Sequence, residues 1–181
     1  MPSRTPIHIG TDRQLFVDDY WIASGSGVIR RLHPPQRRET VLEREKPWER
    51  DSVSYMGTMT DGDRFRAYYR CRDLEAGGVE MTAYQESTDG VHWTKPNLGI
   101  HQFEGSLENN IVWMGPGANM APFRDPHPAS EAERYKAIVR KRDLWALVSR
   151  DGIRWRLMQE EPIATDRPFD SFNVSFWDPW R

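Results

Sequence analysis

Short runs of apolar, β-branched and aromatic residues follow one another along this chain, and polar turn residues separate them. Such runs are typical of β-strands, and Gly, Pro, Asn and Asp between them favour turns. The pairs Asp61-Gly62, Asp89-Gly90 and Asp151-Gly152 border runs of this kind. Eight Trp, 13 Gly and 13 Pro residues also favour strands and loops over helices. The sequence therefore predicts an all-β protein.

The first part of this pattern predicts four consecutive strands joined by hairpins, which form one antiparallel sheet as in a propeller blade. The Asp61-Gly62 pair is a strong hairpin signal between the first two strands. Asp89-Gly90 turns the chain into the last. We expect the four strands at Ser52–Thr60, Phe65–Arg70 and Glu80–Ser87 and around Trp93.

The pattern then occurs a second time. Asp63–Leu74 returns as Glu133–Leu144, 70 residues later, and Ser87–Trp93 returns as Ser149–Trp155, 62 residues later. The first copy therefore carries eight extra residues between its two motifs, in a glycine-containing loop. A unit of about 60 to 70 residues is too long for a helical solenoid repeat and longer than a kelch or WD40 blade. We interpret it as a propeller blade with long loops.

The repeat divides the chain into a leader at 1–50, a first blade at 51–118, a second blade at 119–168 and the first strand of a third blade at 169–181. The strands of the second copy are expected at Asn119–Phe123, Tyr135–Arg140, Trp145–Ser149 and Arg154–Met158, and the third copy opens at Asp170–Pro179. In the leader, Leu15–Ile22 and Val28–Leu32 predict a hairpin. Because a closed ring needs about four blades, we expect an incomplete propeller that self-associates through exposed blade edges.

Charge and hydropathy exclude several partners. The chain has 25 basic and 27 acidic residues, a net charge of −2, and no basic stripe, so nucleic acid and anionic membranes are not expected partners. No apolar run is long enough to span a bilayer. Met1–Gly10 lacks the apolar segment of a secretory signal, which predicts a cytoplasmic protein; secretion or a periplasmic location stays open if the true start lies upstream.

Two turns share the pattern Ser-x-Asp-Gly-x-x-Trp, at Ser87–Trp93 and Ser149–Trp155. They are similar to the Asp boxes of sialidases and other propellers. In such a turn the Asp side chain accepts backbone N–H groups, the Gly takes a positive φ and the Trp packs between blades. We therefore interpret both turns as structural.

Two carboxylates are candidates for catalysis. Asp51 and Asp170 stand immediately before predicted first strands, and Asn119 or the nearby Asn109-Asn110 occupies the corresponding region of the second copy. First strands line the channel of a propeller, so their starting ends converge on one funnel. Carboxylates that meet there can act as acid, base or nucleophile on a glycosidic bond. The alternative is that each Asp builds a turn.

The neighbours of these residues suit carbohydrate, because Trp side chains contact the apolar faces of sugars while charged and amide groups bind hydroxyls. The five His residues show no metal-ligand spacing with one another or with Cys71, and no phosphate-binding glycine motif is present, so no metal or cofactor is expected. The candidate substrate-binding residues are Trp48, Glu49, Arg50, Asn119 and Asn173.

From Leu15 to its last residue the chain resembles the five-bladed β-propeller glycoside hydrolases, the superfamily of families 32, 43, 62 and 68. This resemblance implies an incomplete five-bladed ring and three acids, which are a nucleophile or base, a transition-state stabiliser and a general acid. The matching segments are Leu15–Asp19, Pro47–Glu49, Ser87–Trp93, Asn109–Val112, Glu133–Ala137 and Phe169–Asn173.

The resemblance also implies roles for single residues. Trp48–Asp51 is similar to the Trp-x-x-Asp motif of the family 32 nucleophile, which implies that role for Asp51. Phe123–Pro126 contains the Arg-Asp-Pro sequence of the stabiliser, although the internal repeat places Asp125 in a turn. The Glu-Cys motif of the general acid has no counterpart. Either Asp170 serves as the acid or the acid is missing.

Three functions are therefore expected from the sequence. The first is a glycosidase that acts on furanosides or other polysaccharide side chains through funnel carboxylates. The second is a carbohydrate-binding or scaffold propeller without catalytic acids. The third is a truncated polypeptide that has no function alone.

Overall fold

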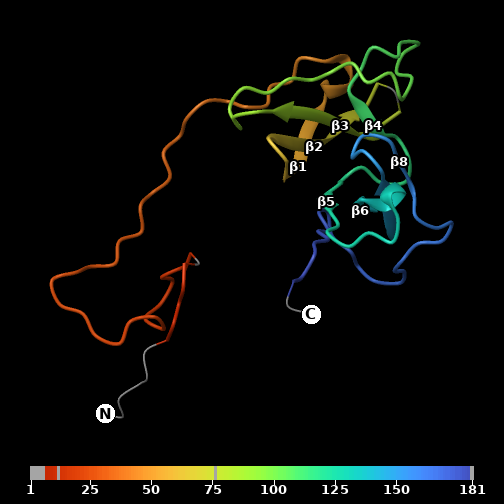
Figure 1. Cartoon of the computed structure of the whole chain (residues 1–181). Helices are drawn as coiled ribbons and strands as arrows, with labels where there is room; N and C mark the ends of the chain where they lie inside the picture. The colour runs from red at the N-terminus through yellow and green to blue at the C-terminus, as the bar shows by residue number, and fades with distance from the viewer. Residues whose placement is uncertain (1–6, 12, 76, 180–181) are drawn as a thin grey trace. The chain divides into compact units, whose positions relative to one another are not determined.

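The computed structural model describes residues 7–11, 13–75 and 77–179. The chain divides into two compact units, residues 1–38 and 39–181 (Figure 1). All strands lie in the second unit, together with two 3-10 helices, η1 (Pro47–Glu49) and η2 (Glu131–Glu133). No helix in this described part is long and apolar enough to cross a membrane.

The first sheet contains four strands in the order β1-β2-β3-β4, and each neighbouring pair is antiparallel (Figure 1). Gly62 has a φ of 65°, a conformation that the tight turn between β1 and β2 requires. The first three strands confirm the predicted segments. The strands are β1 (Ser52–Asp61), β2 (Arg64–Asp73), β3 (Val79–Ser87) and β4 (Ile111–Trp113).

The fourth strand of this sheet differs from the prediction. Around Trp93 only Thr94 forms an isolated bridge, to Glu86. The carboxylate of Asp89 accepts two backbone N–H groups of the following turn, which keeps this segment curled, so it does not extend beside β3. β4 takes that place because all three of its residues are apolar and buried.

The second sheet repeats the same antiparallel order, β5-β6-β7-β8. The segment predicted at Tyr135–Arg140 forms a strand with those same ends. The strand after the Asp151-Gly152 turn also forms as expected. The strands are β5 (Phe123–Arg124), β6 (Tyr135–Arg140), β7 (Leu144–Ser149) and β8 (Trp155–Leu157). The chain is thus all-β, with two four-stranded antiparallel sheets.

Besides the segment around Trp93, two predicted strand regions form no strand among the described residues, and of the strand expected at Asn119–Phe123 only Phe123 lies in a strand. Residues 170–179, expected to open a third blade, pair with no strand; Phe172 instead stacks at 5.9 Å on Tyr55, and Trp177 at 5.0 Å on His127. Residues 180 and 181 of that segment lie outside the described residues. In the leader, the side chains of the expected hairpin are mostly exposed, so little apolar burial is available to hold two strands together.

One buried cluster joins the two sheets. Tyr68, Tyr84 and Val112 of the first sheet pack with Val139 and Leu147 of the second. Polar contacts cross the same boundary. Arg66 donates to the carbonyl oxygen of Asp151 at 2.6 Å, and the hydroxyl of Tyr135 donates to Asp61 at 2.8 Å. The sheets therefore share a core and a set of hydrogen bonds.

Candidate functional site

A polar hollow of about 470 Å³ lies at the end of the first sheet where β1 and β3 begin. We call it the basic hollow, because three of its side chains are cationic and one is anionic. The N-terminal segment of β3, the loop after β4 and the first residues after β6 all border it. The polar side chains that line it are Arg70, Glu80, Asn119, Arg140, Lys141 and Ser171.

The strand register places Asp51 near this hollow. Ser52 pairs with Arg72, which in turn pairs with Glu80 at the edge of the hollow. Two strand spacings separate Ser52 from Glu80, which is a distance of about 10 Å. The carboxylate of Asp51 is exposed and accepts the backbone N–H of Leu74 at 2.5 Å. Asp51 therefore lies at the end of the sheet where β1 begins. One of its carboxylate oxygens accepts a hydrogen bond from the residue that follows β2.

Asp170 belongs to a hydrogen-bonded turn beside the hollow. The hydroxyl and the backbone N–H of Ser171 donate to its carboxylate at 2.9 and 2.6 Å, and the amide of Asn173 donates to its carbonyl oxygen at 2.8 Å. The bonds from Ser171, with a contribution from the nearby guanidinium of Arg140, lower the pKa of Asp170. Among the described residues no direct contact joins the carboxylates of Asp170 and Asp51.

Asn119 connects this turn to the hollow. Its side-chain NH₂ group donates to the carbonyl oxygen of Ser171. The residue is 8% exposed, and its side-chain oxygen has no hydrogen-bond partner. The structure therefore places Asn119 against the turn that contains Asp170 and Asn173.

Three other candidates are not available as expected. Glu49 is fully buried, and its carboxylate accepts hydrogen bonds from Tyr69 at 2.7 Å and Lys95 at 3.0 Å. Trp48 is 6% exposed in the core beside Phe103. Neither side chain lies on the surface of the described structure, which gives no support to the predictions of Trp48 and Glu49 as substrate contacts.

Arg50 is half-exposed, but acidic side chains surround it. Its guanidinium lies 3.0 Å from Glu75, 3.2 Å from Glu104 and 3.8 Å from Asp73. Three carboxylates on one guanidinium leave few donors for a sugar hydroxyl. We therefore infer that the main role of Arg50 is structural, because its ion pairs hold the loops around η1 together.

The basic hollow contains residues that the sequence interpretation missed. Arg70 and Arg140 hold the same position in the two copies of the repeat, and both line the hollow. The recurrence is visible in the sequence, but the sequence analysis assigned no role to either arginine. Only the packing of the two sheets shows that the two arginines line the same hollow.

An apolar hollow of about 480 Å³ lies between three segments that the repeat predicts to be first strands. Residues 56–60 of β1, 121–124 around β5 and 172–176 line it. Gly57 permits the close approach, because an added Cβ would lie 2.9 Å from the carbonyl oxygen of Met120. A bulge in β1 at Tyr55, with a φ of 51°, turns that ring over Arg70 at 4.9 Å.

The Asp-box turns are structural, as predicted. Asp89 and Asp151 each accept two backbone N–H groups of the following residues at 2.7 to 2.8 Å. Gly90 and Gly152 have φ values of 76° and 75°. The tryptophan that follows each glycine donates to that glycine's carbonyl oxygen at 3.0 Å.

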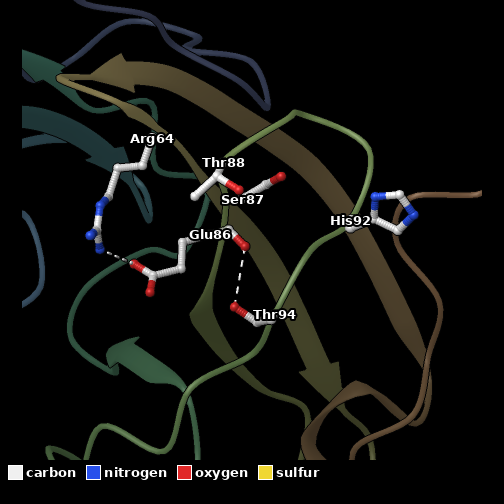
Figure 2. A pocket seen from close by; sticks show the side chains of 6 residues that line it. All are labelled: Arg64, Glu86, Ser87, Thr88, His92 and Thr94. Carbon is white, nitrogen blue, oxygen red and sulfur yellow. Dashed lines mark hydrogen bonds and ion pairs between the residues drawn. The ribbon is translucent and has the colours of Figure 1, made fainter.

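A smaller hollow of about 150 Å³ borders the first of these turns (Figure 2). Figure 2 shows Arg64 directed toward Glu86, with a separation of 3.2 Å, while the ring of His92 points away from that pair. Ser87 donates to Asp89 and not to His92. A serine without a histidine base is not an activated nucleophile, so this hollow has no hydrolytic triad.

Asp125 of the Arg-Asp-Pro sequence is buried at the turn after β5. Its carboxylate lies 2.6 Å from the ammonium of Lys136 and accepts the N–H of His127 at 2.8 Å. Burial opposes ionisation, but these two donors outweigh it and lower the pKa of Asp125. The residue stabilises its own turn, as the internal repeat predicted.

No group of three or more His, Cys, Asp or Glu side chains within the described ranges is arranged to hold a metal ion. Comparison of the chain with protein-family models, with curated proteins and with solved structures gave no match.

Proposed function

We propose that this chain is part of a β-propeller of the glycoside hydrolase type, which binds a glycan at the starting ends of its first strands. The observation that carries the proposal is the apolar hollow. Three segments at the same position of the repeat line it together, which is the arrangement of innermost strands around a propeller channel. The basic hollow lies at the end of β1 where such a channel would open.

The carboxylates beside the basic hollow suit different roles in hydrolysis. Asp170 has a lowered pKa, so it is ionised at neutral pH and fits a base or a stabiliser of positive charge rather than an acid. Asp51, exposed at the start of β1, is the candidate nucleophile or base. Glycoside hydrolysis also needs a protonated acid with a raised pKa. Asp170 does not meet that need.

A second function, a non-catalytic carbohydrate-binding propeller, is favoured by the same electrostatics. Every described carboxylate with a shifted pKa is shifted downward, namely Asp89, Asp125, Asp151 and Asp170. Binding requires no proton donor, whereas hydrolysis requires one. The two functions share the glycan site and differ only in turnover.

The experiment is a combined binding and hydrolysis assay of the 181-residue chain. A set of plant and microbial oligosaccharides is screened for binding by calorimetry and for release of reducing ends. Asp51→Asn should abolish any hydrolysis and leave the melting temperature unchanged. Asp63→Asn, in the exposed β1–β2 turn, is the matched control and should leave both unchanged.

Binding without hydrolysis would favour the second function. Turnover that survives Asp51→Asn would remove this residue from the site. If no oligosaccharide binds, the glycan proposal is wrong.

A further inference from the structure

We infer that the basic hollow binds an anionic sugar, a ring that carries both hydroxyl groups and a carboxylate or sulfate. This inference rests on the proposed glycan-binding function and specifies its ligand class. It depends on the charges, the unpartnered polar atoms and the rigid floor of the hollow.

The charges that line the hollow favour an anion. Arg70, Arg140 and Lys141 are cationic, and Glu80 is the only acidic side chain among the lining residues. Glu80 lies 3.2 Å from Arg70 and neutralises mainly that guanidinium. Asp170 stands nearby, and its ionised carboxylate offsets part of the charge of Arg140. Three cations against two carboxylates leave one net positive charge at the hollow, which the exposed Lys141 supplies.

Three side chains that line the hollow carry a buried polar atom without a partner. The side-chain oxygen of Asn119 is an acceptor without a donor, and Nε of Arg70 and of Arg140 are donors without an acceptor. An unpaired buried polar atom is costly, so a ligand that offers both donors and acceptors gains affinity. A bare anion offers acceptors only, and a neutral sugar offers no charge. A hydroxylated anion offers donors, acceptors and charge.

The floor of the hollow is fixed before any ligand arrives. Gly117 has a φ of 71°, and a Cβ there would collide with the backbone of Arg140. Its carbonyl oxygen accepts the indole N–H of Trp113 at 3.0 Å. The bond from Asn119 to Ser171 holds the amide in one orientation. A preformed site binds more tightly because less ordering is needed.

The size of the hollow agrees with this ligand class. Its volume of about 470 Å³ falls within the range of roughly 300 to 1,000 Å³ that is typical of small-molecule sites. The ring of Tyr55 lies 4.9 Å from the guanidinium of Arg70 and so helps to fix this wall of the hollow.

The test compares matched ligands on the full chain by calorimetry. Tri-galacturonate and its methyl ester share the same rings and linkages, but the ester carries a methyl group in place of each negative charge. Galactose 6-sulfate against galactose separates a sulfate from a carboxylate source. We expect the acid to bind at least about tenfold more tightly than the ester, because a charge-assisted hydrogen bond is worth at least that ratio. Arg140→Gln and Lys141→Gln should each remove most of this preference.

Arg156→Gln is the control, since Arg156 is an exposed arginine of β8 that does not line the hollow. It should leave the preference intact. Lys141 is exposed, so its variant keeps the test valid even if Arg140→Gln does not fold. Tighter binding of either tri-galacturonate or galactose 6-sulfate shows whether the hollow prefers a carboxylate or a sulfate, and either result supports the inference.

Equal binding of acid and ester would overturn the anionic ligand and leave glycan binding intact. A preference that Arg156→Gln reduces as much as Lys141→Gln would also overturn it, since the effect would then be general charge. If none of these ligands binds but a neutral glycan of another class does, only the further inference fails. Absence of binding to every glycan would overturn the proposed function itself.

Discussion

The hydroxyl of Tyr68, in β2, donates a hydrogen bond of 2.8 Å to the carbonyl oxygen of Gly152 in the Asp-box turn of the second sheet. Tyr68 is fully buried, and its ring also packs edge-on against Trp155 at 6.1 Å. A turn that the sequence marks as local therefore serves as a long-range contact. It makes the second turn different from the first, although the two share one sequence pattern.

Replacement of Gly152 by Ala should be more harmful than the same change at Gly90. Both glycines have a positive φ, so each replacement costs about 1 to 2 kcal/mol. At Gly152 the new Cβ would also lie 2.5 Å from the guanidinium of Arg66, which must move, and 3.1 Å from the hydroxyl of Tyr68, whereas at Gly90 the nearest atoms lie 3.7 Å away, in Phe65. We expect Gly152→Ala to lower the free energy of unfolding by about 3 kcal/mol in total.

Urea denaturation of the two variants measures this difference. Equal losses of stability would show that the turn of the second sheet is not in contact with the first sheet.

Trp155 should contribute more to stability than Trp93. Each indole donates the same hydrogen bond to a glycine carbonyl oxygen, but only Trp155 packs on the core cluster shared by the sheets. We expect Trp155→Ala to cost about 2 to 3 kcal/mol and Trp93→Ala clearly less. Thermal unfolding followed by circular dichroism compares them. A larger loss for Trp93→Ala would contradict this interpretation.

Glu49 should contribute to the free energy of unfolding, and Asp51 should not. The carboxylate of Glu49 is fully buried, and it pairs with the ammonium of Lys95, whose side chain is 9% exposed. Glu49→Gln leaves that ammonium without its counter-charge, which costs about 3 kcal/mol. Asp51→Asn keeps an oxygen that can accept the N–H of Leu74. Chemical denaturation of both variants should show a shift for Glu49→Gln alone.

The contact between His92 and Asp89 should respond to pH. Nδ1 of His92 lies 2.7 Å from Oδ2 of Asp89. This hydrogen bond raises the pKa of His92 above its ordinary value of 6.5 and, with backbone N–H donors, lowers the pKa of Asp89 below 3.8. The contribution of His92 to the stability of the fold is fully present below pH 6.5 and is lost as the pH rises through the raised pKa of His92. That of Asp89 is present above pH 3.8 and is lost as the pH falls.

Both contributions are therefore present between pH 3.8 and 6.5. An NMR titration of the His92 ring in the wild type and in Asp89→Asn checks the cause. The variant should have the lower His92 pKa. Identical titration curves would mean that water screens this exposed pair completely.

Much of the fold was predictable where turn chemistry marks both ends of a strand. Tyr135–Arg140 lies between the 3-10 turn at η2 and the next hairpin, and its bounds were predicted correctly. The fourth strand of the first sheet was missed for the opposite reason. The side chain of Asp89 binds backbone N–H groups that would otherwise pair with a neighbouring strand. A pattern of apolar residues does not show this competition.

The sequence led to some residues near the proposed site and missed others. The expectation that first strands begin at one end of a propeller led to Asn119 and Asp170, which lie near each other in the structure. It did not separate Asp51 from Glu49, two residues apart, because burial depends on packing against Tyr69 and Lys95. The basic side chains of the hollow follow from contact between the two copies, which sequence alone does not provide.

Arg70 and Arg140 occupy one position of the repeat, but their surroundings differ. Arg70 bonds to Glu80 and lies under the ring of Tyr55, so its contacts stay within the first copy. Arg140 lies against Gly117 of the first copy, where an added Cβ would not fit, and its charge lowers the pKa of Asp170 near the end of the chain. One repeat position thus supports a single sheet in the first copy and connects three segments of the chain in the second.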